Sequence, residues 1–270
     1  MAYRELAPPP ALRGLVECGW VSTLGSGAAP QVRDVLPDGC MDLLRIGDEM
    51  LIAGPDTAPH PVRLDAGVPV AGLRFVPGAL PGLLGVPASA LRDQRVPLAE
   101  VYPRAARPAT PRVGAGGRAS RDPGAREPGP GCDGEDARAI LAGVAATALA
   151  LPGIAPPDPF TRELASRIGS GAGAAATADA LGCTTRTLHR QCLAAFGYGP
   201  AMLRRVLRFR RASALLHAGM APAEVAALAG YADQPHLSRE VRALAGVAPR
   251  QLASGANTST PLPSGSSTTA

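Results

Sequence analysis

The 270-residue sequence contains no lysine, and aromatic residues make up only 3% of it. All 27 of its basic residues are therefore arginines, whose planar guanidinium groups donate paired hydrogen bonds. Because aromatic rings are scarce and the hydrophobic fraction is an ordinary 46%, Leu, Val and Ala must fill the cores. The length is sufficient for two domains, each with its own core.

Long apolar runs are also missing. No stretch reaches the roughly 18 apolar residues of a membrane-spanning helix. The first ten residues, MAYRELAPPP, lack the basic and apolar segments of a secretory signal. We therefore expect a cytoplasmic protein with no membrane partner.

Cysteine and histidine lack the spacing of metal ligands. The cysteines are odd in number, form no C-x-x-C pair, and stand at Cys18, Cys40, Cys132, Cys183 and Cys192. The histidines are His60, His189, His217 and His236. We expect neither a metal site nor a cofactor, and no disulfide framework. Cys18 and Cys40 could still meet as reactive thiols, although burial as small apolar residues is the favoured interpretation.

Charge is distributed unevenly along the chain. Residues 1–103 carry 8 Arg against 11 acidic residues, a net charge of −3. Residues 104–158 carry 7 Arg against 6 acidic residues, and residues 159–270 carry 12 against 5, a net charge of +7. A basic C-terminal section is typical of a module that binds a polyanion, although arginine can also serve only to solubilise a surface.

The first section, residues 1–103, is divided by turn motifs such as GSG, PDG and GPD. Between them lie apolar runs of strand length at 19–24, 41–46 and 70–76, which favour a small antiparallel barrel or sandwich. Helical spacing at 79–84 indicates one or two short helices that close the strand region.

The second section, residues 104–158, has a different composition. Residues 103–136 contain six Pro and seven Gly without apolar periodicity, which predicts a linker. A local frame error in the coding sequence is the alternative. Residues 137–151, ARAILAGVAATALAL, read as an apolar helix that packs either on the first domain or on a second copy of the chain.

The third section, residues 159–254, reads as successive short helices before a disordered tail at 255–270. Thr184 is a natural N-cap for TTRTLHRQCLAAFG, in which Leu188, Cys192 and Phe196 share one face. A short helix, a glycine turn and this capped helix form a helix-turn-helix.

A long helix and a second helix-turn-helix follow. The polar face of the long helix is expected to carry Arg204, Arg205, Arg208, Arg210 and Arg211. In the second unit Asp233 is the expected N-cap, with Val225, Ala226 and Leu228 facing inward before it and Leu237, Val241 and Leu244 facing the core after it. The predicted fold class is therefore α+β with two domains, a small antiparallel β-rich N-terminal domain and an all-α C-terminal domain with two helix-turn-helix units.

In order and spacing, the motifs of residues 160–252 resemble the AraC-type transcriptional regulators. They are ALGCTTRTLHRQC with FGYGP, RFRRASALL, and EVAALAGYADQPHLSREVRALAGVAPRQL. The chain departs from the family at Cys192, Leu237 and Ala245, where Phe is usual, and at Gly199 and Ala248, where Ser or Thr is common. The N-terminal section, with LPDGCMDLL and AGPDT, is similar to the β-rich domain that in this family senses a ligand or mediates dimerisation.

The resemblance implies sequence-specific binding to double-stranded DNA, with each second helix in a major groove. The implied DNA-binding positions are Thr185, Arg186, His189 and Arg190 in the first unit and Gln234, Pro235, His236 and Arg239 in the second. A small-molecule effector and a homodimer are further partners that it leaves open. We expect no enzymatic activity; the alternative is an alkyl-accepting cysteine protein for DNA repair or sensing, with Cys18 or Cys40 as acceptor.

Overall fold

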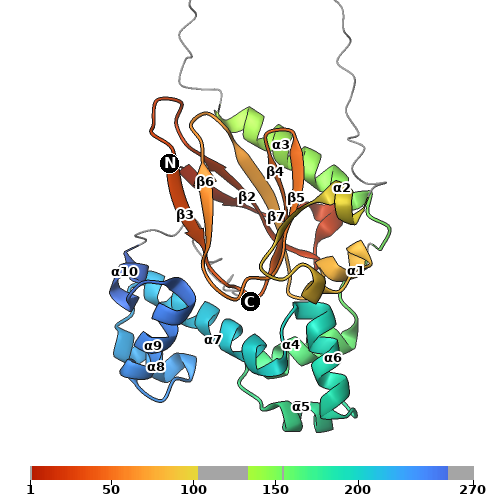
Figure 1. The fold of residues 1–270 in the computed structure, drawn as a ribbon, viewed down its shortest axis with the longest axis vertical. Helices are drawn as coiled ribbons and strands as arrows, with labels where there is room; N and C mark the ends of the chain where they lie inside the picture. Colours follow the sequence, from red (N-terminus) through yellow and green to blue (C-terminus); the bar gives the residue numbers. More distant parts are fainter. Residues whose placement is uncertain (1, 103–132, 154, 255–270) are drawn as a thin grey trace, which may run out of the picture.

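A computed structural model describes residues 2–102, 133–153 and 155–254 (Figure 1). A β-rich N-terminal region and a helical C-terminal region confirm the predicted α+β class. The strands are β1 (Ala2–Leu6), β2 (Val16–Thr23), β3 (Gln31–Val35), β4 (Met41–Ile46), β5 (Glu49–Ala53), β6 (His60–Leu64), β7 (Val70–Phe75) and β8 (Arg95–Pro97). The helices are α1 (Leu80–Leu84), α2 (Leu98–Val101), α3 (Asp133–Leu149), α4 (Pro159–Gly169), α5 (Ala174–Ala180), α6 (Thr185–Phe196), α7 (Pro200–His217), α8 (Pro222–Ala229), α9 (Gln234–Ala245) and α10 (Pro249–Ala253), with 3-10 turns η1 (Pro10–Leu12) and η2 (Ala88–Ala90).

The strands form two antiparallel sheets. Six of them pair in the order β1-β2-β7-β4-β5-β8, and β3 pairs with β6 alone. Successive side chains of a strand point to opposite faces, so Leu43 of β4 joins the main N-terminal core and Leu44 joins a second cluster shared with Leu64 of β6. The β3–β6 pair thus covers one face of the larger sheet.

Helix α3 covers the opposite face of the six-stranded sheet (Figure 1). Leu141, Val144 and Ala148 are buried in the same core as Leu43 and Leu73 of the sheet. Of the two alternatives for this helix, packing on the N-terminal sheet is therefore the one observed. The predicted linker and the tail at 255–270 lie outside the described residues, apart from the beginning of α3.

The C-terminal region contains two helix-turn-helix units, α5–α6 and α8–α9, at the two ends of α7 (Figure 1). The Thr184 hydroxyl accepts a hydrogen bond from the Thr187 backbone N–H at 3.1 Å. Asp233 Oδ1 accepts one from the His236 backbone N–H at 2.6 Å. Both predicted N-caps are confirmed, and each satisfies a backbone donor at the start of its helix.

The inward positions of the second unit are only partly those predicted. Val225 and Ala226 are buried, but Leu228 is 50% exposed and Ala229 is buried instead. Helix α8 is only eight residues long, so the predicted face could shift by one residue. No helix within the described ranges is both long and apolar enough to cross a membrane.

Candidate nucleic-acid interface

The first half of α6 presents polar side chains to solvent while its other face is anchored in a core. Thr185, Arg186, His189 and Arg190 are all exposed. Leu188, Cys192 and Phe196 are almost completely buried, as their shared face predicted. The four proposed positions therefore share an accessible surface on a helix whose orientation is fixed by apolar packing.

Gly199, one of the positions where the sequence differs from the AraC-type pattern, contacts this surface. A Cβ atom on Gly199 would come within 2.8 Å of the His189 Nε2 atom. The His189 ring thus lies against the backbone at the start of α7, and a larger residue at position 199 would require this exposed ring to move.

The first half of α9 presents a similar set. Gln234, Pro235 and Arg239 are exposed, whereas His236 is only partly exposed. The His236 ring makes an edge-on contact with the buried Tyr231 ring, with 5.2 Å between centroids. His236 thus also helps to hold the turn before α9, a role that the sequence pattern did not indicate.

The sequence pattern predicts that all five arginines of α7 lie on an open polar face, but the structure differs for Arg205, Arg208 and Arg210. Arg204 and Arg211 are exposed, but Arg205 Nε lies 2.8 Å from Glu240 Oε2 on α9. Arg208 lies 3.7 Å from the same oxygen, and its guanidinium stacks over the Tyr231 ring at 4.3 Å. These contacts join α9 to α7 and fix the orientation of α9.

The N-terminal region makes an apolar contact with the second unit. Leu36, directly after β3, is 4% exposed and is buried in the same cluster as Phe209, Tyr231 and Leu237. An N-terminal residue thus completes a C-terminal core.

Polar contacts connect the N-terminal region to the segment directly after α6 and to α7. The Tyr198 hydroxyl, after α6, donates a buried hydrogen bond of 2.8 Å to the Asp56 backbone carbonyl. Arg210 of α7 pairs with Glu17 at 2.6 Å and donates to the Cys40 Sγ atom at 3.4 Å. Burial alone would lower the pKa of Arg210, but Cys40 and Glu17 favour its charged form, and the net result is a raised pKa. The helical region is therefore held against the strands by specific contacts.

The cysteine thiols of the N-terminal region are buried. Burial raises the pKa of Cys18 to about 12, against the opposing effect of Arg74. Burial likewise raises the pKa of Cys40 well above its ordinary value. A thiol that stays protonated is a poor nucleophile. Among the described cysteines all are free thiols, and the described residues contain no cluster of three or more metal-ligating side chains.

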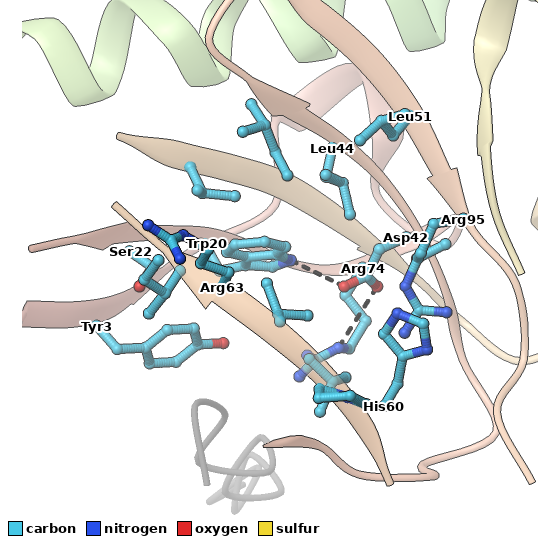
Figure 2. Close-up of a pocket in the computed structure, with 17 residues that line it drawn as sticks. Tyr3, Trp20, Ser22, Asp42, Leu44, Leu51, His60, Arg63, Arg74 and Arg95 are labelled. Atoms are coloured by element: carbon cyan, nitrogen blue, oxygen red, sulfur yellow. Dashed lines mark hydrogen bonds and ion pairs between the residues drawn. The ribbon is translucent and has the colours of Figure 1, made fainter. Parts of the chain in front are cut away.

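A cavity of about 300 Å³ lies between the six-stranded sheet and the β3–β6 pair (Figure 2). Its walls are largely apolar, with Trp20 on one side and Leu44 and Leu51 on another. The Trp20 ring lies directly over Gly72, where a Cβ atom would come within 2.6 Å of the indole. No local sequence pattern marks this cavity, because the residues that form it come from strands far apart in the chain.

Comparison with known proteins gives one match in each region. Residues 177–254 match a family described as a helix-turn-helix domain, and residues 4–97 match a domain of unknown function. No curated protein matches the chain in sequence.

Among solved structures, the chain is similar to those of ToxT from Vibrio cholerae. A variant without ligand is 12% identical, with a TM-score of 0.46 over 87% of this chain and 95% of that one. Another ToxT structure is 10% identical, with a TM-score of 0.46 over 93% and 97% of the two chains. A third, bound to a methylnaphthalenyl butenoic acid, is 10% identical, with a TM-score of 0.44 over 93% and 98%.

Proposed function

We propose that this chain is a DNA-binding transcriptional regulator of the AraC type and that it reads DNA through two successive major grooves. The observation that carries the proposal is the matched exposure of the first halves of α6 and α9. In each unit, a side-chain N-cap and an apolar core fix the helix behind that exposed surface. Helix α7 would hold the two recognition helices about one DNA turn, roughly 34 Å, apart on one side of the duplex.

The exposed side chains suit different parts of the groove. Arg186 and Arg239 can each donate two hydrogen bonds to the O6 and N7 atoms of a guanine, and Gln234 suits the N6 and N7 atoms of an adenine. Pro235 offers only apolar contact, for example to a thymine methyl group. Arg190 is equally suited to a phosphate, which would position the first helix without reading sequence.

The N-terminal region would serve as the regulatory part of the molecule. Its cavity has the volume and the apolar walls of a small-molecule site. The contacts of Leu36, Tyr198 and Arg210 provide a physical route by which a change around that cavity could reach the helical region. A homodimer would present four recognition helices, and the number of protected grooves on DNA would distinguish it from a single chain.

We also propose that the protein is not an enzyme. The alternative of an alkyl-accepting cysteine requires a thiolate that a substrate can reach. Cys18 and Cys40 are instead buried, with pKa values raised above their ordinary range. Neither thiol has the low pKa that activates a cysteine nucleophile.

Selection of duplexes from a random pool by the purified full chain tests the proposed function. We expect the enriched duplexes to share two short motifs separated by about one helical turn, because two helices would read bases at that spacing. A pool with unchanged sequence composition after several rounds, at a salt concentration that permits binding, would contradict base reading. Counterion release alone would then explain any affinity.

A further inference from the structure

The cavity between the two sheets has a polar end as well as apolar walls. Asp42 and Arg74, paired across β4 and β7, line this end, and Asp42 accepts a 3.0 Å hydrogen bond from Trp20 Nε1 (Figure 2). At the other end, Ser22 is 5% exposed and its hydroxyl has no hydrogen-bond partner. Ser22 stands opposite Val70, four residues along β7 from Arg74, or about 13 Å of strand.

Two of the three guanidinium groups that line the cavity, those of Arg95 and Arg63, are each paired with one carboxylate. Arg95 pairs with Asp56 through two hydrogen bonds of 2.7 and 2.9 Å. Arg63 lies 2.8 Å from Asp65. These two arginines therefore bring no free positive charge to a ligand.

Arg74, the third arginine of the lining, is surrounded by more carboxylates than it can neutralise. It is 2% exposed and is shared by three carboxylates, those of Glu5, Asp38 and Asp42, at 3.7, 3.3 and 3.6 Å. When all are ionised, one positive charge faces three negative charges, which leaves two in excess. No hydrogen bond satisfies Arg74 Nε or Nη1, so the pairing is also geometrically loose.

Asp42 is the carboxylate of this group that lines the cavity. Burial raises its pKa to about 6, although Arg74 opposes that rise. His60 lies nearby in the lining, and burial, reinforced by Arg95, lowers the pKa of its ring. A positive ligand group beside Asp42 would offset the excess charge, whereas an anion would add to it.

We propose that this cavity binds a small arylalkyl amine, with its ammonium group paired to Asp42 and its ring against Trp20 and the aliphatic wall. This inference rests on the proposed regulatory role of the N-terminal region. An aromatic face beside a carboxylate is a favourable setting for an organic cation. The free Ser22 hydroxyl gives a polar group at the far end of the ligand a hydrogen-bond partner.

The bound amine would act on the helical region through Arg74. Asp38, a second partner of Arg74, accepts a 2.8 Å hydrogen bond from the Cys40 backbone N–H. Cys40 in turn contacts Arg210 of α7. When the ammonium group pairs with Asp42, the ion pair between Arg74 and Asp42 weakens and the ion pair between Arg74 and Asp38 strengthens. Asp38 belongs to the turn that contacts α7 through Cys40.

The test is calorimetric titration of the full chain with three matched probes. These are tyramine, its carboxylate counterpart hydroxyphenylpropanoate and its neutral counterpart hydroxyphenylethanol. We expect tyramine to bind at least about tenfold more tightly than either of the others, because only it pairs with Asp42. Equal or tighter binding of the carboxylate or the alcohol, or no heat from any probe at millimolar concentration, overturns the proposal.

Two variants locate the site. Asp42→Asn keeps the shape of the side chain and should weaken tyramine binding at least about tenfold. Asp48→Asn is the matched control, because Asp48 is fully exposed and lies outside the cavity lining. The Asp48→Asn variant should bind tyramine as tightly as the parent protein does. Unchanged tyramine binding by Asp42→Asn overturns the proposal. Should Asp42→Asn not fold, the probe comparison on the parent chain still decides.

DNA binding is measured separately and without any probe. Amine binding without sequence-selective DNA binding would contradict the proposed function and leave the cavity assignment standing. Selective DNA binding without amine preference would overturn the cavity assignment alone.

Discussion

Arg239→Ala should lower affinity for the selected duplex by about 1 to 3 kcal/mol, or roughly 5- to 150-fold, and hardly change affinity for random duplex. Arg239 is exposed on α9, six residues beyond the Asp233 cap, and makes no ion pair in the described structure. Loss of a bidentate guanine contact affects only the duplex that carries that guanine. Binding isotherms on the two duplexes over a salt series measure the difference.

Arg242→Ala is the matched control. Arg242 is exposed on the same helix but lies in its last turn, away from the end that would enter the groove. Its loss should affect selected and random duplexes alike, with a salt slope lower by about one unit if it touches phosphate. If Arg239→Ala weakened both duplexes equally, the second unit would act as an electrostatic clamp, and base reading would fall to Arg186, His189 and Arg190.

Leu36→Asp should uncouple the N-terminal region from the second helix-turn-helix unit. A carboxylate cannot stay in the cluster around Phe209 and Tyr231 without a partner, so the segment after β3 must leave it. The loss of the buried leucine alone should cost about 2 to 5 kcal/mol. In scanning calorimetry we expect the variant to unfold in two separated transitions, the helical region first, where the parent chain unfolds in one.

Val32→Asp controls for the added charge. Val32 lies on the preceding strand, β3, and is 65% exposed, so its variant should unfold as the parent chain does. A Leu36→Asp variant with the parental transition and midpoint would mean that the contact between the two regions contributes nothing to stability.

Local sequence signals predicted the elements that hold the candidate site. Thr184 and Asp233 were recognisable as N-caps because a short polar side chain precedes an apolar periodic run. The strands β2, β4 and β7 were recognisable as apolar runs between turns. The β3–β6 pair was not, because its strands are short and largely polar and depend on each other for pairing.

Contacts between residues distant in the chain could not be predicted in this way. The sequence pattern predicts Arg205 and Arg208 on a solvated helix face, yet both form ion pairs with Glu240 of α9. Glu17 does the same to Arg210 from β2. Their partners lie tens to hundreds of residues away, and no local pattern marks them. The roles of the eight proposed DNA-binding residues stay predictions.

Reading of two successive grooves by one chain is tested most directly by hydroxyl-radical footprinting of the parent protein on the selected duplex. The expected result is two protected stretches on one side of the DNA, with centres about 10 to 10.5 base pairs apart. Arg239→Ala should weaken protection in one stretch more than in the other. A single protected stretch, or protection that moves freely along the duplex, would contradict the two-groove arrangement.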